Sequence, residues 1–126
     1  MAKRRLTLKV RIPPYESPRN AWRRKLHRAI VSKQKRRRIQ YRPTDFLELD
    51  IRLYIPGKSL KAHDVDNRMK DVMDALQGRA GGPKSERVLA AIIPNDCQVY
   101  RVTMVKSEPP GQSYGEGHLI VRKYRK

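Results

Sequence analysis

Four aspartates lie within the sixteen residues KAHDVDNRMKDVMDAL, at positions 64, 66, 71 and 74, and a fifth follows at Asp96. Carboxylates this close together disfavour one another's charge, so the segment needs a nearby cation or a specific task. Carboxylate oxygens are hard ligands of the kind that Mg²⁺ and Mn²⁺ prefer. A bound metal would offset the repulsion, activate water and stabilise charge on a phosphoryl group. If the fold brings the turn at Asp96 beside Asp64 and Asp66, the three carboxylates could hold such a metal.

The spacing of Asp64 and Asp66 favours an extended backbone over residues 63–66, which leads into a helix near Asp66. Residues two apart point the same way in extended chain, whereas in a helix they do not face each other. Helix capping and the helix dipole would explain one aspartate at this position, but they do not easily explain two. The competing interpretation stays open: the acids cap the helix and keep its surface soluble.

The helix after these aspartates is predicted from the apolar spacing of Val65, Met69, Val72, Met73 and Leu76, with an end near Gly78. Its polar stripe carries Asp66, Lys70 and Asp74 at i, i+4 and i+8. Lys70 would hold a phosphate oxygen or support an attacking water. Asp71 is expected on the solvent side.

The charge of the chain indicates a polyanionic partner. Its 126 residues include 30 Lys and Arg against 12 Asp and Glu, a net charge of +18. Residues 1–42 hold sixteen of the basic residues and one acid, Glu16. The simplest partner of such a region is nucleic acid. Its predicted DNA contacts are Arg23, Arg24, Lys33, Lys35, Arg36, Arg37 and Arg38.

Composition also narrows the protein class. The single cysteine, Cys97, excludes an intramolecular disulfide and a multi-cysteine zinc site, which fits a reducing cytoplasm. The sequence shows no long apolar run and no signal-peptide pattern, so we expect no membrane association.

The remaining elements predict one α+β domain over residues 1–126, with a mixed sheet and two main helices. The first helix begins at Ser17-Pro18, contributes Trp22 to the core and frays into a basic loop at 33–38. Residues 78–86 are predicted to form a loop. The expected strands are 6–12, 47–55, 88–93, 99–105 and 118–124.

Two segments, 63–74 and 95–99, resemble the RusA-type Holliday junction resolvases. That family pairs a D-[LV]-D-N-x-x-K-x-x-x-D-A-L segment with a downstream D-D-x-Q-V turn. The first motif matches through Asp64, Asp66, Asn67, Lys70, Asp74, Ala75 and Leu76, and the second through Asp96, Gln98 and Val99. The opening strand ending in IPP, followed by a basic helix, is also similar.

The resemblance implies a small homodimeric, Mg²⁺-dependent endonuclease, with Mn²⁺ as a substitute, that resolves four-way DNA junctions by paired nicks in recombination and repair. Asp64, Asp66 and Asp96 would be the catalytic metal ligands and Lys70 a catalytic lysine. Supporting roles fall to Asn67, Asp74 and Asn95. The protein would be cytoplasmic, nucleoid-associated, and of bacterial or phage origin.

Two departures from the family pattern matter. Asn95 stands where the family has the first acid of its pair, which would weaken metal affinity. The segment 77–95 is also longer than the family connection, and its Gly81-Gly82-Pro83 suggests a surface loop that would alter substrate choice or dimer contacts.

Two alternatives remain. A non-catalytic nucleic-acid-binding protein, ribosomal or chromosome-associated, would share the charge but would not need the aspartate motifs. A related nuclease would act on flaps or forks. Loop tyrosines offer a further nucleic-acid contact, because Tyr15, Tyr41 and Tyr114 would stack on unpaired bases if they are more than ordinary loop residues.

Overall fold

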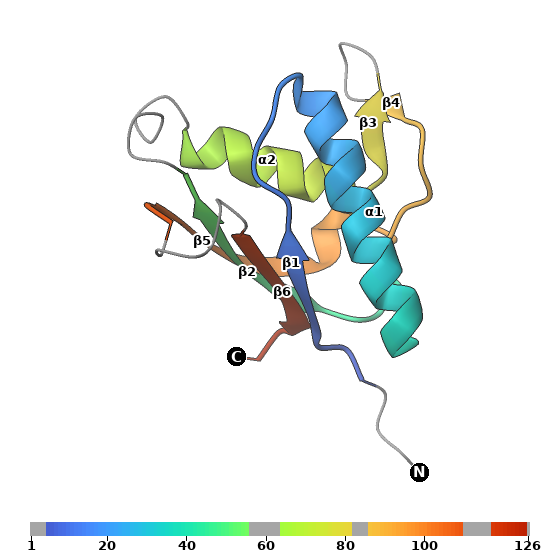
Figure 1. Ribbon diagram of the computed structural model, residues 1–126. Coiled ribbons are helices and arrows are strands. Elements are labelled where there is room, and N and C mark those ends of the chain that lie inside the picture. The colour runs from blue at the N-terminus through green and yellow to red at the C-terminus, as the bar shows by residue number, and fades with distance from the viewer. Residues whose placement is uncertain (1–4, 56–63, 82–85, 110–116, 126) are drawn as a thin grey trace.

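The structure, a computed structural model, describes residues 5–55, 64–81, 86–109 and 117–125. It is a small α+β domain, as the sequence predicts, with two helices and a mixed four-stranded sheet. The elements in chain order are β1 (Leu8–Ile12), α1 (Arg19–Arg37), β2 (Leu47–Tyr54), α2 (Val65–Leu76), β3 (Arg79–Gly81), β4 (Glu86–Arg87), the 3₁₀ helix η2 (Asp96–Gln98), β5 (Val99–Ser107) and β6 (Gly117–Lys123) (Figure 1).

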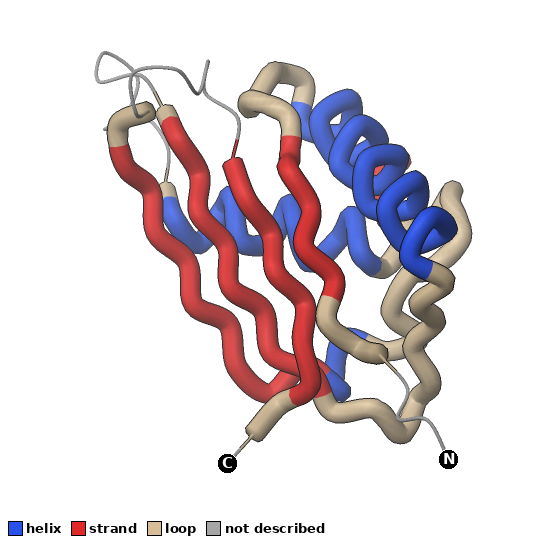
Figure 2. The backbone as a smooth tube through the Cα atoms, turned by 60° about the horizontal axis from the view of Figure 1, so that its bottom comes forward, coloured by secondary structure: helices blue, strands red, loops and turns tan. Residues whose placement is uncertain are grey.

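The four-stranded sheet has the order β1-β6-β2-β5. The strand β6 pairs antiparallel with both β1 and β2, and Leu8 lies opposite Val121. The strands β2 and β5 are parallel, with Leu49 opposite Val102. A parallel pair needs a crossover connection. Here α2 is part of that connection: it follows β2 in sequence and runs back across one face of the sheet before β5 begins (Figure 2). This β2-α2-β5 unit determines where each acidic motif can lie.

Both helices cover one face of the sheet, and no described element covers the other (Figure 2). The alternating apolar residues of the strands point under the helices, as in the fully buried Leu47, Leu49 and Ile51 of β2. Trp22 from α1 is also fully buried, as predicted, and its indole N–H donates to the carbonyl of Pro13 at 3.0 Å. The exposed face of the sheet carries the alternate, mostly polar positions.

The segment 33–38 is helical through Arg37, so the prediction of a frayed basic loop is wrong. Lys, Gln and Arg are good helix formers, and cations interact favourably with the C-terminal end of a helix. Arg38 then takes a left-handed conformation, with φ of 56°, and ends the helix. The next residue, Ile39, is buried and donates its N–H to the carbonyl of Gln34 at 3.1 Å.

The helix α2 ends as predicted, with Gly78 at φ +74° directly after its last turn. The following segment differs from both expectations for it. Residues 79–81 form a short strand, whereas 88–93 form none and instead wrap around the end of α2. The carbonyl of Gly78 accepts from Val88 and Leu89, and that of Leu76 accepts from Ile92. The backbone of 88–93 therefore hydrogen-bonds to the end of α2, in place of the pairing with a neighbouring strand that its apolar composition predicts.

In the part of the chain that the structure describes, no helix combines the length and the apolar composition that crossing a membrane requires.

Candidate functional site

Asp64 and Asp66 lie exposed at the N-terminal end of α2. The helix begins at Val65, so only Asp64 is extended, and Asp66 already belongs to the first turn. The predicted extended stretch 63–66 is therefore too long, and position 63 lies outside the described residues. Asp64 makes no capping bond; its Oδ2 accepts from the Asn67 amide at 3.3 Å. Asp64 thus occupies the N-cap position of α2, but a capping hydrogen bond does not account for its carboxylate.

Asp71 is fully buried between the helices, so the prediction that it faces solvent is wrong. Its Oδ1 accepts from Nε of Arg19 at 2.8 Å and from Nε of Arg23 at 3.0 Å, both from α1. Its Oδ2 lies 3.3 Å from Nε of Arg68, an ion pair without hydrogen-bond geometry. The guanidinium of Arg68 in turn lies 4.0 Å from the ring centroid of Tyr15. Asp71 is thus the anionic centre of the α1–α2 contact.

Asp74 is also an ion-pair residue. Its Oδ2 lies 3.1 Å from Nη2 of the buried Arg23 and 2.9 Å from Nζ of Lys70. Lys70 occupies the predicted polar stripe one turn after Asp66 and is exposed. Two of the four aspartates in the segment, Asp71 and Asp74, are therefore used to join the helices, and the other two are not.

Asp96 lies at the other end of α2 from Asp64 and Asp66. It begins η2, directly before β5, and β5 runs parallel to β2. The segment before η2 is attached to the C-terminal end of the helix, where the Gln77 side-chain amide donates to the carbonyl of Ile93 at 2.7 Å. A helix of twelve residues is about 18 Å long. The crossover thus separates the two acidic motifs within one chain (Figure 1).

No group of three or more His, Cys, Asp or Glu side chains is placed to hold a metal ion anywhere in the described ranges. The expected convergence of Asp64, Asp66 and Asp96 is accordingly not formed within a single copy. What the chain does bring together is the pair Asp64 and Asp66 with Asn67 beside them. Asp66 has no hydrogen bond or ion pair with any other residue that the structure describes.

Asn95 has a local structural role. Its Oδ1 accepts from the N–H of Cys97 at 2.9 Å, and its own N–H donates to Oε1 of Gln98 at 2.9 Å. These reciprocal bonds form a capping box around η2. The Gln98 amide also donates to the carbonyls of Arg42 and Asp45 at 2.8 and 2.7 Å, which fastens the turn to the residues before β2. The Asn95 oxygen expected to support a metal is used in this cap.

The basic residues of α1 divide into two sets. Arg23 is only 3% exposed and is held by Asp71 and Asp74, so the prediction that it contacts DNA conflicts with its placement. Lys33 is partly buried. Of the other predicted contacts, Arg24, Lys35, Arg36, Arg37 and Arg38 are exposed, as are Lys25 and Arg28 of the same helix. The side chains of residues 35–38 form a cationic surface at the C-terminal end of α1.

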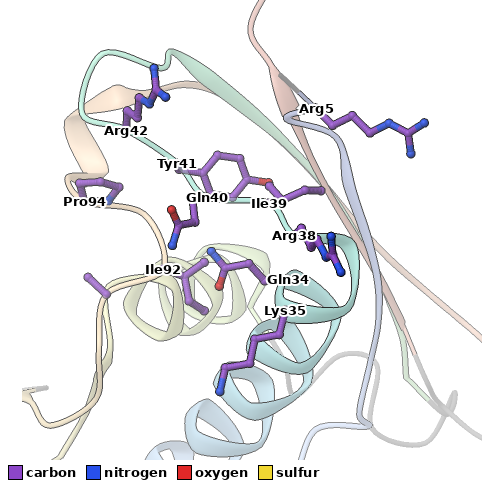
Figure 3. Close-up of a pocket in the computed structure, with 11 residues that line it drawn as sticks. Arg5, Gln34, Lys35, Arg38, Ile39, Gln40, Tyr41, Arg42, Ile92 and Pro94 are labelled. Atoms are coloured by element: carbon purple, nitrogen blue, oxygen red, sulfur yellow. The ribbon is translucent and has the colours of Figure 1, made fainter. Parts of the chain in front are cut away.

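A cavity of about 920 Å³ adjoins this surface (Figure 3). Arg38 and Arg5 lie on one side of it and Arg42 on the other, with Lys35 below in the same view. Apolar and amide side chains also line it, among them Ile92 and Gln34. Three arginines and a lysine in the lining are suited to a polyanion, because their cationic groups bind phosphate and the guanidinium groups also match its geometry.

Two of the three tyrosines singled out for base stacking, Tyr41 and Tyr15, make contacts inside the protein. Tyr41 is buried, and its hydroxyl donates to the carbonyl of Leu6 at 2.9 Å. Burial, with Asp45 nearby, raises the pKa of Tyr41 above its usual range. Tyr15 packs edge-on against Trp22, and Tyr114 lies outside the described residues. The exposed aromatic rings of the described ranges include Phe46 and Tyr100, which sequence reasoning missed.

In comparisons with known proteins, no family model matches the chain, and no curated protein matches it.

Proposed function

We propose that this protein is a metal-dependent endonuclease that binds branched DNA, a four-way junction above all, and cuts it by paired nicks. The observation that carries the proposal is the division of labour among the aspartates of α2. Asp71 and Asp74 neutralise buried arginine, whereas Asp64 and Asp66 are exposed at the helix start. The two exposed aspartates are also the ones that begin the motif resembling the RusA-type resolvases.

The donor set at the start of α2 fits a small divalent cation. Mg²⁺ commonly binds through one or two carboxylates together with substrate phosphates. Asp64 and Asp66 would hold the cation. Such a cation, when bound, supplies an activated water and stabilises charge on the phosphate. Lys70, with its ammonium already on the same side of the helix as Asp74, would contact a phosphate oxygen of the substrate.

A homodimer would complete this site. Because α2 separates Asp96 from Asp64 and Asp66 in one chain, a shared site needs Asp96 from a second copy. Two such sites, one for each α2, would match the paired nicks of junction resolution. The exposed basic residues of α1 would hold the arms through phosphate contacts, which carry little sequence information.

The experiment compares a four-way junction, a flap and a linear duplex, each with Mg²⁺ and with EDTA, for the parent protein and for Asp66→Asn. Asparagine keeps the size of the side chain and removes the charge that would recruit the metal. We expect junction cleavage by the parent only with Mg²⁺ and a loss of orders of magnitude in Asp66→Asn. Junction affinity in EDTA should hold or rise, because a carboxylate that repels phosphate is gone.

A non-catalytic nucleic-acid-binding function is the second candidate, because the basic cavity exists independently of Asp64 and Asp66. This function predicts tight junction binding with no cleavage in Mg²⁺ or Mn²⁺. Preferred cleavage of the flap would instead assign the same chemistry to flaps or forks.

A further inference from the structure

Three aromatic rings from distant parts of the chain gather at one end of the sheet. Phe46 lies directly before β2, Tyr100 is the second residue of β5, and Tyr124 follows β6 directly. The N–H of Tyr124 donates to the carbonyl of Phe46 at 2.8 Å, which fixes the two chain segments side by side. The rings of Phe46 and Tyr100 stack with centroids 4.8 Å apart and planes inclined by 27°. Tyr124 lies 5.3 Å from Tyr100, centroid to centroid.

These rings are not core residues. Phe46 is 49% exposed and Tyr100 is 55% exposed. A register shift places Leu47 opposite Val99 and Glu48 opposite Arg101, so Tyr100 is the extra residue of a bulge. Bulges re-aim a side chain out of the regular alternation. Here the bulge places the Tyr100 ring against Phe46. Large aromatic side chains usually contribute to stability by being buried, and these two are exposed.

Cations surround the cluster. A cavity of about 1200 Å³ is lined by the rings and by the exposed Arg5, Lys123 and Arg125. The acid that lines it, Asp45, already accepts from the N–H of Arg42 through Oδ2 at 2.7 Å. Arg5 also lines the basic cavity beside Arg38 and Arg42, so the two cavities adjoin at this residue.

We propose that Phe46, Tyr100 and Tyr124 form a stacking platform for unpaired nucleotides, with Arg5, Lys123 and Arg125 holding the adjoining phosphates. Single-stranded nucleic acid is bound in this way by many proteins, through aromatic faces for the bases and a positive groove for the backbone. An apolar peptide would use the rings but not the surrounding cations. The inference rests on the proposed function only in taking DNA as the ligand, and it needs neither metal nor cleavage.

The test measures binding of a fluorescent single-stranded oligonucleotide of about a dozen nucleotides, a length within known single-strand site sizes. A duplex hairpin of equal charge serves as the second probe, and both titrations are done in EDTA. The variants are Tyr100→Ala, Tyr100→Phe and Tyr100→Leu. The control is Tyr54→Ala, a tyrosine at the far end of β2 that packs edge-on against His118.

Loss of one stacked base should weaken single-strand binding by roughly five- to 150-fold in Tyr100→Ala and in Tyr100→Leu. Tyr100→Phe and Tyr54→Ala should remain within about two-fold of the parent, as should duplex binding by every variant. Circular dichroism checks folding, and Tyr100→Leu, which retains apolar contact with Phe46, covers the case in which the alanine variant unfolds.

Any of three binding results would overturn the platform. The parent protein could fail to bind the single strand, the single-strand affinity of Tyr100→Leu could equal that of the parent, or Tyr100→Ala could lose affinity for both probes equally. A change in oligomeric state on light scattering, without a specific loss of single-strand binding, would assign the rings to contact between copies and would also reject the proposal. None of these results bears on cleavage by Asp66→Asn, so the two proposals fail separately.

Discussion

Nη2 of Arg23 lies 2.9 Å from Oδ1 of Asp71, and these side chains are 3% and 0% exposed. The arginine belongs to the helix richest in positive charge, and the aspartate to the helix richest in acids. Their contact shows that part of the charge on each helix serves to join them. These internal charges stabilise the fold, so the charges available to a ligand are the exposed ones.

The first prediction concerns stability. Asp71→Asn removes the carboxylate shared by Arg19, Arg23 and Arg68. Arg23 keeps Asp74, whereas the buried Arg68 loses its ion pair. Breaking a buried ion pair in this way costs about 3–5 kcal/mol of unfolding free energy. Urea denaturation measures it. Asp66→Asn is the matched control and should change stability by less than about 0.5 kcal/mol. Equal effects of the two variants would contradict the structural role of Asp71.

The second prediction tests the shared site. Asp66→Asn and Asp96→Asn should each be inactive alone. Mixed and allowed to exchange subunits, they form heterodimers in which one of the two sites has both carboxylates. Nicking of one strand should then reappear, without the paired cut. A mixture as inactive as its components would show that Asp96 does not complete a site across two copies.

The third prediction concerns phosphate binding at the end of α1. Replacing Arg36, Arg37 and Arg38 by glutamine should weaken junction binding. It should also flatten the log-log dependence of affinity on salt by about 0.9 for each DNA phosphate that the variant no longer neutralises. The control is Arg79→Gln, an exposed arginine on β3. An unchanged slope in the triple variant would remove the helix end from the interface.

The fourth prediction concerns Asn95. Its oxygen caps η2, so Asn95→Ala should cost about 1 kcal/mol, whereas Asn95→Asp keeps the cap and the stability. Because that oxygen is engaged, Asn95→Asp should leave the Mg²⁺ concentration for half-maximal cleavage unchanged. A lower requirement in this variant would mean that the side chain turns toward the metal.

Periodicity predicted the elements that alternate or repeat regularly. The strands that became β1, β2, β5 and β6 each have apolar residues at every second position, and their bounds agree within a few residues. The strand predicted for the apolar run at 88–93 is wrong, because backbone N–H groups of this run donate to carbonyls at the end of α2 instead of to a neighbouring strand. Local composition cannot reveal such a partner, because the partner lies elsewhere in the chain.

The candidate site shows the same limit. Arg68, Asp71 and Ala75 recur at helical spacing and are buried against α1, a face that hydrophobicity alone cannot recognise because two of its three members are charged. The separation of Asp96 from Asp64 follows from the parallel direction of β2 and β5, which no residue type encodes. The exposed ring of Tyr100 depends on a bulge, and it too was found only in three dimensions.

The position of β6 has a consequence for how the chain folds. It is the last strand in sequence, yet it lies between β1 and β2 inside the sheet. Among the described strands, β1 pairs with β6 alone, Leu8 opposite Val121, so its ladder cannot form until residues more than a hundred positions later are available. Long-range pairing of this kind slows folding, because the entropy cost of closing the long loop comes before the stabilising contacts form. A nascent chain still lacking β6 would hold its two helices over an incomplete sheet, and the four strands could join into one sheet only after β6 leaves the ribosome.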